Sequence, residues 1–450
     1  MSHDEIGVLL GKGESEKIEF KEKFDREAIE TAAAFANTKG GVILIGFSDK
    51  GRVKGIQIGK ETLKDWANQI SQCTEPSIVP EIKQAEIEGK DVVMIWIKEV
   101  PIKPVSVRGR CLRRVGNSNR IMTPNEVAQV HLATTGTSWD KLPAKDASVD
   151  AIDLAKVKRY VNKANQSGRR KIGNDETPLQ VLEKLDLIKD GQATWAAILL
   201  FRKDGKRFLS QTAVHCGRFK EETIVIDDRM IEGTIIEQID DAMDFIRKNI
   251  NVRFVMTGRP AREEIWDYPI EALREALINA VCHRDYTIPS NTEVRIYDDR
   301  LIVWNPGGLP LGITMDDLYK PHPSVLRNKG IGEIFYDVGL IEQWGSGIDK
   351  MRSACLKSGL PEPQFEEYQG FRVIFRKDVY TEEYLRNLGL NERQIKAVMY
   401  VKEKGKITNK EYREITGLSD EGVRIDVNGL IGKGVLLSKG RGRNVHYVLK

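Results

Sequence analysis

Hydrophobic positions recur at helical spacing in three stretches of the chain. REAIETAAAFAN predicts a helix from about Arg26 to Asn37, which the pair Gly40-Gly41 ends. Residues 233–250, GTIIEQIDDAMDFIRKNI, and residues 270–285, IEALREALINAVCHRD, predict two further amphipathic helices. Short apolar runs predict strands instead, namely VILIGF, DVVMIWIKEV and WAAILLF. The expected fold class is therefore a combination of α/β and α+β units in a multidomain chain.

Changes in this pattern divide the chain into three units. The first, residues 1–135, alternates helix and strand and ends in a helix near Pro124. Residues 136–150 include KLPAKDASVD, whose small, polar and proline content predicts a linker. Mixed α/β signals then fill residues 151–380, and residues 388–450 have a compact helical pattern of their own. We expect each unit to form its own core.

Composition narrows the class of protein. Charged residues make up 30% of the 450 positions and hydrophobic residues 40%, which is typical of a soluble globular chain. No apolar run approaches the roughly 20 residues that span a bilayer, and MSHDEIGVLL lacks the pattern of a secretion signal. We expect a cytoplasmic protein without a membrane partner. The five cysteines are scattered without a CxxC spacing, so reduced thiols are expected rather than a zinc site.

The last sixty residues combine a helical pattern with a one-sided charge. NERQIKAVMYVKEKG predicts one helix, and TNKEYREITG and SDEGVRIDVNGLIGKG predict two more around the turn Thr416-Gly417-Leu418. VLLSKGRGRNVHYVLK then predicts two strands with a basic Gly-rich turn. No acidic residue occurs after Asp426, although the net charge of the whole chain is only +4. Such a run can neutralise phosphates.

This segment resembles the C-terminal winged helix-turn-helix of bacterial and archaeal transcription regulators. The resemblance implies that DNA is the partner, and that four basic residues contact it: Arg424, Lys439, Arg441 and Arg443. The alternative is a winged helix used only for dimerisation or docking. We expect a regulator of this kind to be a homo-oligomer.

Three motifs of the first unit carry a second resemblance. GESEKIEFKEKF, AAAFANTKGGVILIGFSDKGRVKG and PVSVRGRCLRRVGNSNRIMTP are similar to the Schlafen-like, divergent AlbA-type domain, from about Gly13 to Val130. The resemblance implies that Glu14, Glu19 and Asp49 are catalytic and hold Mg²⁺ or Mn²⁺ for phosphodiester cleavage. Hard oxygen ligands suit these ions. The alternative is that the two glutamates are surface charges and that Asp49 only makes the turn before Gly51.

The same domain offers cations for a nucleic-acid backbone. Positive side chains near the motifs can neutralise phosphates of DNA or RNA, namely Lys21, Arg113, Arg114 and Arg120. Many proteins that contain this domain are regarded as binding modules, so binding without cleavage is the first expectation and cleavage the alternative.

The helix at residues 270–285 has a polar stripe on an otherwise apolar surface. Glu275, Asn279 and His283 recur every four residues, and buried polar groups need partners. A ligand is one way to provide them. For His283 we expect a hydrogen-bonded core position, because no HxxxH partner lies nearby. Downstream, Gly345 and Gly347 precede a helix, where backbone amides can approach phosphate.

Together these pieces resemble the divergent ATPase fold of gyrase, heat-shock chaperones and histidine kinases, in the version labelled helicase-related. The resemblance implies an ATP site in which Glu275 is the general base and Asn279 the magnesium ligand. Asn305, Gly307 and Gly308 match the adenine-side loop, and Gly345 and Gly347 the phosphate-side loop. Asn305 replaces the family's adenine-contacting acid, which disfavours hydrolysis. The alternative is a degenerate fold whose polar stripe contacts another subunit.

Two functions remain open from the sequence. One is a DNA-binding transcription regulator with a nucleotide-binding centre, and the other is a metal-dependent endonuclease acting on RNA or single-stranded DNA. A helicase motor is not supported, because the sequence contains no GxxxxGK[ST] phosphate loop.

Overall fold

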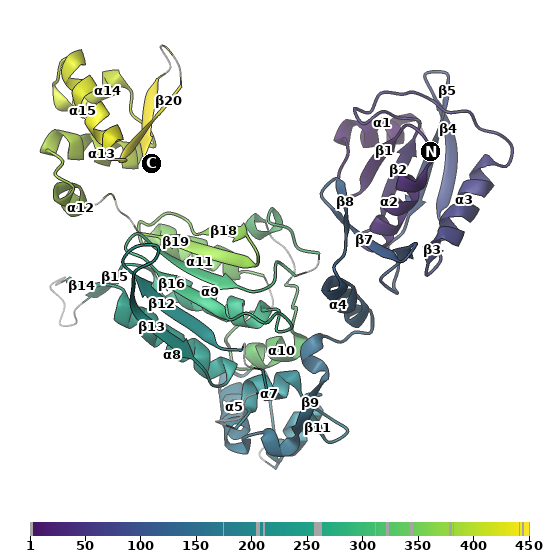
Figure 1. The fold of residues 1–450 in the computed structure, drawn as a ribbon, viewed down its shortest axis with the longest axis horizontal. Coiled ribbons are helices and arrows are strands. Elements are labelled where there is room, and N and C mark those ends of the chain that lie inside the picture. The colour runs from purple at the N-terminus through teal and green to yellow at the C-terminus, as the bar shows by residue number, and fades with distance from the viewer. Residues whose placement is uncertain are drawn as a thin grey trace.

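The computed structural model describes residues 3–173, 175–203, 208–209, 212–255, 263–310, 312–320, 324–342, 345–377, 380, 382–440, 442 and 445–449. Helices and strands alternate through most of the chain, so the expected mixed α/β class is confirmed. Figure 1 shows three parts joined in sequence, with the largest in the middle.

The first part contains a four-stranded sheet in the order β1-β2-β5-β4. α2 and α3 cover one face with a core around Phe35, Ile43 and Ile70, while α1 covers the other face beside Phe20. Asp25 begins α2 by accepting hydrogen bonds from the N–H groups of the first turn, and this confirms the predicted helix. The elements are α1 (His3–Lys12), β1 (Ile18–Lys21), α2 (Arg26–Ala36), β2 (Gly41–Ile45), α3 (Thr62–Cys73), β4 (Glu81–Ile87) and β5 (Lys90–Ile97).

A second small sheet and a helix complete this part. The Asn37 amide at the end of α2 donates to the carbonyls of Val105 and Leu112, each at 2.8 Å, and so ties the second sheet to the first. Thr123 and Glu126 form a capping box at the start of α4, as expected for a helix near Pro124. The elements are β3 (Thr74–Glu75), β6 (Ser106–Val107), β7 (Arg110–Val115), β8 (Ser118–Ile121) and α4 (Pro124–Thr134).

The segment after α4 corrects two predictions. Residues 136–150 are not a linker, because β9 lies there and its Ala144 and Ala147 are buried in the central core. WAAILLF forms the helix α7 rather than a strand, since Thr194 caps it and a short apolar run has no period that separates the two structures. The elements are η1 (Trp139–Lys141), β9 (Pro143–Ser148), η2 (Val149–Ala151), α5 (Leu154–Ser167), α6 (Pro178–Lys184), β10 (Ile188–Lys189), β11 (Gln192–Thr194) and α7 (Trp195–Phe201).

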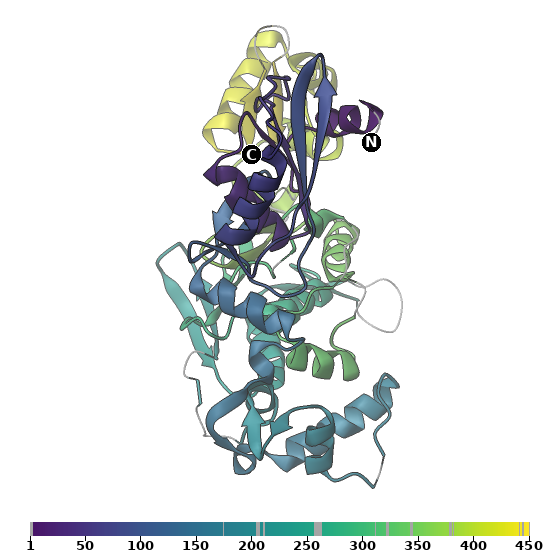
Figure 2. The same cartoon turned by 90° about the vertical axis from the view of Figure 1, so that its right-hand side faces the viewer.

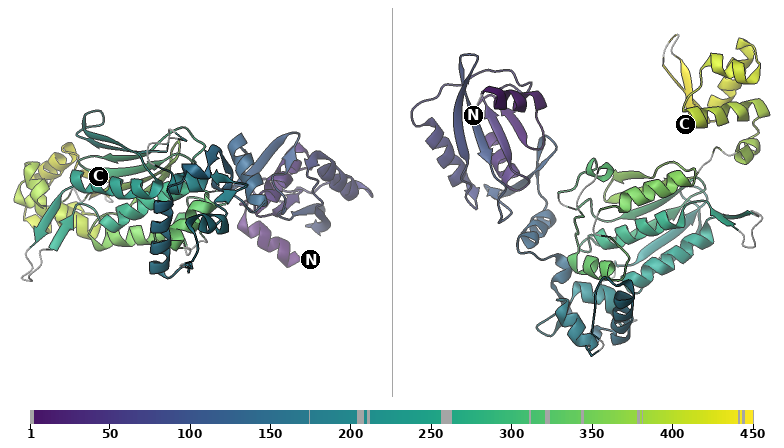
Figure 3. Two further views of the ribbon diagram at one scale, coloured as in Figure 1. Left: turned by 90° about the horizontal axis from the view of Figure 1, so that it is seen from below. Right: turned by 180° about the vertical axis from the view of Figure 1, so that it is seen from behind.

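A six-stranded sheet in the order β13-β12-β16-β17-β19-β18 forms the centre of the molecule. β12 and β16 are parallel, whereas the other neighbours are antiparallel. The predicted helices α8 and α9 are confirmed and lie with α11 along one face (Figures 1 and 3). The strands are β12 (Val214–Phe219), β13 (Val225–Ile231), β16 (Thr292–Ile296), β17 (Arg300–Asn305), β18 (Gln364–Glu367) and β19 (Phe371–Arg376).

The helices and smaller elements of the centre surround this sheet. They are α8 (Ile235–Asn249), α9 (Ile270–His283), η3 (Asp317–Tyr319), α10 (Lys329–Asp337) and α11 (Gly347–Lys357), with a hairpin of β14 (Val252–Val255) and β15 (Glu263–Trp266). One continuous core runs from Ala144 to Phe375.

Three helices and a hairpin form most of the last part of the chain. Asn391 and Gly405 cap α13 at its two ends, as the sequence predicts. Val398, Tyr412 and Leu430 contribute to a separate core. The elements are α12 (Glu382–Asn387), α13 (Glu392–Lys404), α14 (Asn409–Thr416), α15 (Asp420–Gly432), β20 (Leu436–Lys439) and β21 (His446–Leu449).

The first and last parts extend from the central part on opposite sides and remain apart in Figure 1 and in both views of Figure 3. In Figure 2 both lie at the upper end of the molecule. Among the described residues, no helix combines the length and apolar character that crossing a membrane requires.

Candidate functional site

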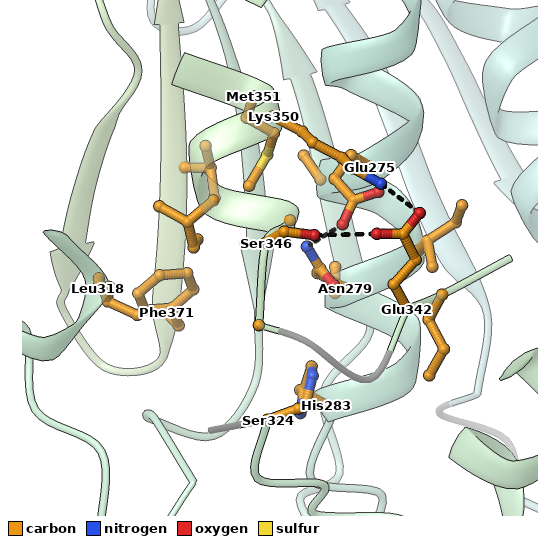
Figure 4. A pocket seen from close by; sticks show the side chains of 18 of the residues that line it. Glu275, Asn279, His283, Leu318, Ser324, Glu342, Ser346, Lys350, Met351 and Phe371 are labelled. Atoms are coloured by element: carbon orange, nitrogen blue, oxygen red, sulfur yellow. Dashed lines mark hydrogen bonds and ion pairs between the residues drawn. The ribbon is translucent and has the colours of Figure 1, made fainter. Parts of the chain in front are cut away.

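A cavity of about 400 Å³ opens between α9, α11 and the end of β17. Its size lies within the usual range of small-molecule sites. Figure 4 shows polar side chains gathered at one end and apolar side chains at the other. Six of the seven predicted nucleotide-site residues line this cavity, namely Glu275, Asn279, Asn305, Gly308, Gly345 and Gly347. The structure therefore brings together residues that lie up to 72 positions apart (347 − 275).

The polar end of the cavity is built by the packing of α11 against α9. The Asn279 amide donates to Oε1 of Glu275 at 3.1 Å, one helical turn away. A Cβ atom at Gly347 would lie 2.2 Å from the same oxygen, so a side chain at this position would displace the end of the Glu275 side chain. Burial raises the pKa of Glu275, while the Asn279 hydrogen bond and the charge of Lys350 oppose that rise.

An ion pair forms the rim beside these residues. The Lys350 ammonium lies 2.7 Å from Glu342, and the Ser346 hydroxyl donates to Glu342 at 3.0 Å (Figure 4). These hydrogen bonds lower the pKa of Glu342. The sequence interpretation missed all three residues. Lys350 lies one turn after Gly347 on the same helix, and residues one turn apart share a helix face. This spacing could have identified Lys350 as a site residue.

His283 contributes a half-buried ring to the cavity lining, and its Nδ1 atom is buried. Its Nδ1 has no hydrogen-bond partner within the described residues, so the expected hydrogen-bonded core position is wrong in that respect. Burial, followed by the charge of Arg327, lowers the pKa of His283 to about 4, and the ring is neutral near pH 7. An unpaired buried nitrogen costs free energy unless a ligand or water pairs with it.

The opposite end of the cavity is apolar. Leu318, Met351 and Phe371 line it together with Val303 (Figure 4). Asn305 is buried there, and its amide oxygen accepts from the Thr292 hydroxyl at 3.2 Å. A flat aromatic ring fits such an end, whereas a charged group belongs at the other.

Gly307 is the predicted residue that does not line the cavity. A Cβ atom there would lie 2.7 Å from Cβ of Asp285. Glycine at this position therefore allows the loop to pack closely against Asp285. Asp285 accepts hydrogen bonds from Gln129 at 2.9 Å and Asn125 at 3.2 Å, and pairs with Arg327 at 3.1 Å. Arg327 also donates to the Gly308 carbonyl on the cavity wall. The helix α4 and the cavity thus meet at one buried carboxylate.

The three acids of the first part are not brought together as a metal site. Glu19 is buried, and its carboxylate contacts Arg114 at 2.6 Å and Lys21 at 3.1 Å. Glu14 instead accepts from the Phe20 amide, and Asp49 is exposed. Across the described part of the chain, no three His, Cys, Asp or Glu side chains are grouped to hold a metal ion. Two cations already neutralise Glu19, so the residues present do not fit the expected Mg²⁺ or Mn²⁺.

The predicted phosphate-binding cations of this part differ in availability. The Arg114 side chain has 0% exposure and is held by Glu19 and the Ser15 carbonyl. Its predicted contact with nucleic acid is therefore wrong, because the guanidinium is part of the core. Arg113 pairs with Glu126 at 2.8 Å, and Lys21 with Glu19 and Glu27. Arg120 on β8 is exposed.

In the last part, Arg424 on α15 and Lys439 on β20 are both exposed. Arg441 and Arg443 lie outside the described residues. The hairpin of β20 and β21 pairs Leu436 with Leu449 and Lys439 with His446, and it follows α15 directly. The exposed side chains of Arg424 and Lys439 are therefore open to a partner.

Comparisons with known proteins confirm two of the three sequence resemblances, those of the first and central units. Residues 14–123 match the family described as "Schlafen, AlbA_2". Residues 290–375 match the family described as "Putative ATP-dependent DNA helicase recG C-terminal". The chain thus combines a Schlafen-type AlbA_2 domain with a RecG-C-terminal-like ATPase domain. The two domains define a nucleic-acid-related protein, and the second indicates nucleotide binding.

Two solved structures are similar to the chain. The DIP2311 protein from Corynebacterium diphtheriae is 20% identical, with 99% of this chain and 96% of that chain covered and a TM-score of 0.45. The N-terminal domain of the "Putative ATP-dependent DNA Helicase RecG-related Protein" from Nitrosomonas europaea is 26% identical over 26% of this chain and 93% of that chain, with a TM-score of 0.21. Both TM-scores are low, and these similarities support no statement about activity. No curated protein matches the chain.

Proposed function

We propose that this chain is a DNA-binding transcription regulator whose central cavity binds ATP or ADP. The observation that carries the proposal is the polar end of the cavity, where Glu275 and Asn279 of α9 face the glycine-lined start of α11. Helix starts with open backbone amides bind anionic phosphate. The apolar end beside Phe371 offers a surface for an adenine ring. The neutral, unpaired His283 supplies a further hydrogen-bonding atom for the ligand.

The two outer parts provide the nucleic-acid side of the proposal. The order of α13, α14, α15 and the hairpin supports a winged helix-turn-helix in residues 388–450, with α15 as the helix that enters the groove. Exposed Arg424 and Lys439 would meet phosphates, joined by Arg441 and Arg443 of the wing. In this proposal residues 1–135 form one further unit, with Arg120 binding a nucleic-acid backbone, and the central unit includes β9, whose Ala144 and Ala147 lie in its core.

Isothermal titration with ATP and ADP tests the central claim. The unsubstituted protein should bind one nucleotide, and Glu275→Ala and Asn279→Ala should each weaken binding while circular dichroism stays unchanged. Asp244→Ala, an exposed carboxylate on α8 outside the cavity, is the matched control and should bind normally. Absence of nucleotide binding by the unsubstituted protein contradicts the proposal.

The alternative of a metal-dependent endonuclease stays a prediction. The pairing of Glu19 with Arg114 and Lys21 gives it no support. Manganese-dependent cleavage of RNA or single-stranded DNA that is lost in Glu19→Ala and Asp49→Ala would favour the nuclease over pure binding.

A further inference from the structure

β13 lies at one edge of the central six-stranded sheet and pairs only with β12 on its inner side. Within the described residues, no strand covers its outer edge. Large apolar side chains are concentrated on and beside this strand, and four are exposed by 44% or more: Ile224, Val225, Ile226 and Met230. The unpaired edge and the apolar side chains therefore coincide.

Such an edge is unfavourable in a chain that works alone. Unpaired backbone N–H and C=O groups on an edge strand invite pairing with another strand, and proteins usually protect them with charged side chains, especially lysine, with proline or with a bulge. Residues 225–231, VIDDRMI, contain neither lysine nor proline, and their three charged residues, Asp227, Asp228 and Arg229, are of both signs. The irregular pairing with β12 leaves Ile226 without a partner on β12, because Arg218 pairs with Asp227 and Phe219 with Val225, and positions 227–231 are regular. The regular stretch is therefore open to a partner strand.

The sequence of the strand is complementary to itself. When two copies run antiparallel about Asp228, exposed Ile226 comes opposite exposed Met230 of the other copy. Asp227 then faces Arg229, so opposite charges meet on both sides of the axis. An axis at Asp227 would place Val225 against Arg229. An axis at Arg229 would place Asp227 against Ile231. The axis at Asp228 is the one of these three that matches both apolar and charged positions.

We propose that β13 pairs with β13 of a second copy of this chain, antiparallel about a two-fold axis at Asp228. The interface joins the two sheets of six strands into one continuous sheet. A two-fold axis makes the same patch meet itself, which is the commonest symmetry of homodimers.

The surrounding charges are arranged for this pairing. Arg229 is exposed and makes no ion pair or hydrogen bond within the described residues, so its guanidinium is available to the second copy. Asp227 contacts Lys248 at 3.0 Å on its own chain, and its side chain remains 29% exposed. At the axis, Asp228 of one copy lies opposite Asp228 of the other. Nε2 of His215, on the neighbouring strand β12 of the same copy, lies 2.6 Å from each Asp228 carboxylate and holds it away from the second carboxylate.

The mass in solution tests the proposal. Light scattering coupled to size exclusion should give twice the 50.9 kDa of the single chain for the full protein. In Ile226→Asp, the new carboxylate of each copy lies opposite Met230 of the other copy. This variant should give the single-chain mass, with the far-ultraviolet circular dichroism unchanged. Val79→Asp is the matched control, because Val79 is 87% exposed and lies outside the central sheet. A single-chain mass for the unsubstituted protein, or a dimer unaffected by Ile226→Asp, overturns the proposal.

Disulfide formation tests the register independently. Asp228→Cys places two thiols at the axis, and mild oxidation should give a covalent dimer. In Val225→Cys, residue 225 of one copy lies opposite residue 231 of the other, six residues away from the second thiol. The two Cα atoms of residue 225 are then about 20 Å apart, which is too far for a disulfide bond. This variant should stay uncrosslinked, like the unsubstituted protein with its five native cysteines. Crosslinking of Val225→Cys in place of Asp228→Cys contradicts the axis at Asp228.

Discussion

Oε1 of Glu275 occupies the space in which a Cβ atom of residue 347 would lie, at 2.2 Å from the ideal position on Gly347. We predict that Gly347→Ala displaces the Glu275 carboxylate from its place beside Asn279, because a carboxylate and a methyl group cannot share that space. Such overpacking costs about 1–3 kcal/mol. ATP or ADP affinity should fall by at least about tenfold, which corresponds to roughly 1.4 kcal/mol. Isothermal titration measures this change.

Gly432→Ala is the control for that prediction, since nothing lies within 4 Å of a Cβ atom there. It should leave nucleotide affinity unchanged. Equal affinities of Gly347→Ala and the unsubstituted protein would show that the start of α11 takes no part in the site.

His283 should make the fold sensitive to acid. Its folded-state pKa of about 4 lies below the usual 6.5, so between these values only the unfolded chain takes up the proton. The stability contributed by the neutral ring is therefore lost as the pH falls from 6.5 towards 4. The loss amounts to roughly 3 kcal/mol at the lower end. Urea unfolding of His283→Gln should show a shallower decline over this window than the unsubstituted protein, and parallel declines would contradict the shifted pKa.

The buried pair of Asp285 and Arg327 should matter far more than a surface pair. Its side chains are only 7% and 10% exposed, and Asp285 also holds Asn125 and Gln129 of α4. Asp285→Asn leaves the Arg327 charge uncompensated, and we expect a loss of about 3–5 kcal/mol in the free energy of unfolding. Asp240→Asn removes the exposed pair with Arg274 and should cost at most about 1 kcal/mol. Urea titrations that give similar losses for both would refute this distinction.

Substitution of Arg114 should affect the stability of the fold, whereas substitution of Arg120 should affect nucleic-acid binding. Arg114→Ala leaves Glu19 buried without its closest cation, so the melting temperature should fall. Arg120→Ala should keep the melting temperature, weaken nucleic-acid binding and reduce the salt slope by roughly one, because it removes one exposed phosphate contact. Thermal unfolding and fluorescence anisotropy at several salt concentrations distinguish the two. The opposite outcome would mean that the buried arginine reaches the ligand.

The basic wing should contribute to duplex DNA binding. We expect the double substitution Arg441→Ala and Arg443→Ala to weaken binding and to lower the salt slope by roughly two, one for each phosphate contact. Lys410→Ala, an exposed lysine on α14 that the proposal does not place in the groove, is the control. Gel-shift titrations of all three proteins measure the effect, and an unchanged slope in the double variant would remove the wing from the interface.

The sequence by itself determined the elements whose pattern is long and capped. α2, α8 and α13 were predicted because periodic apolar positions and capping residues act locally, whereas α9 was predicted from its apolar periodicity without a capping side chain. The same holds for the polar stripe of Glu275, Asn279 and His283, since residues four apart lie on one face of a helix. The two family resemblances also follow from local motifs and were confirmed.

Tertiary structure decided the rest, because burial depends on what other segments supply. WAAILLF became a helix and residues 143–148 a strand, as the central core takes up their side chains. Arg114, exposed by any local criterion, is buried because Glu19 lies 95 positions earlier and neutralises it. Gly307 faces Asp285 instead of the cavity, and the contact of Gly347 with Glu275 joins residues from separate helices. Distances between segments far apart in sequence arise only when the chain packs, and no local pattern contains them.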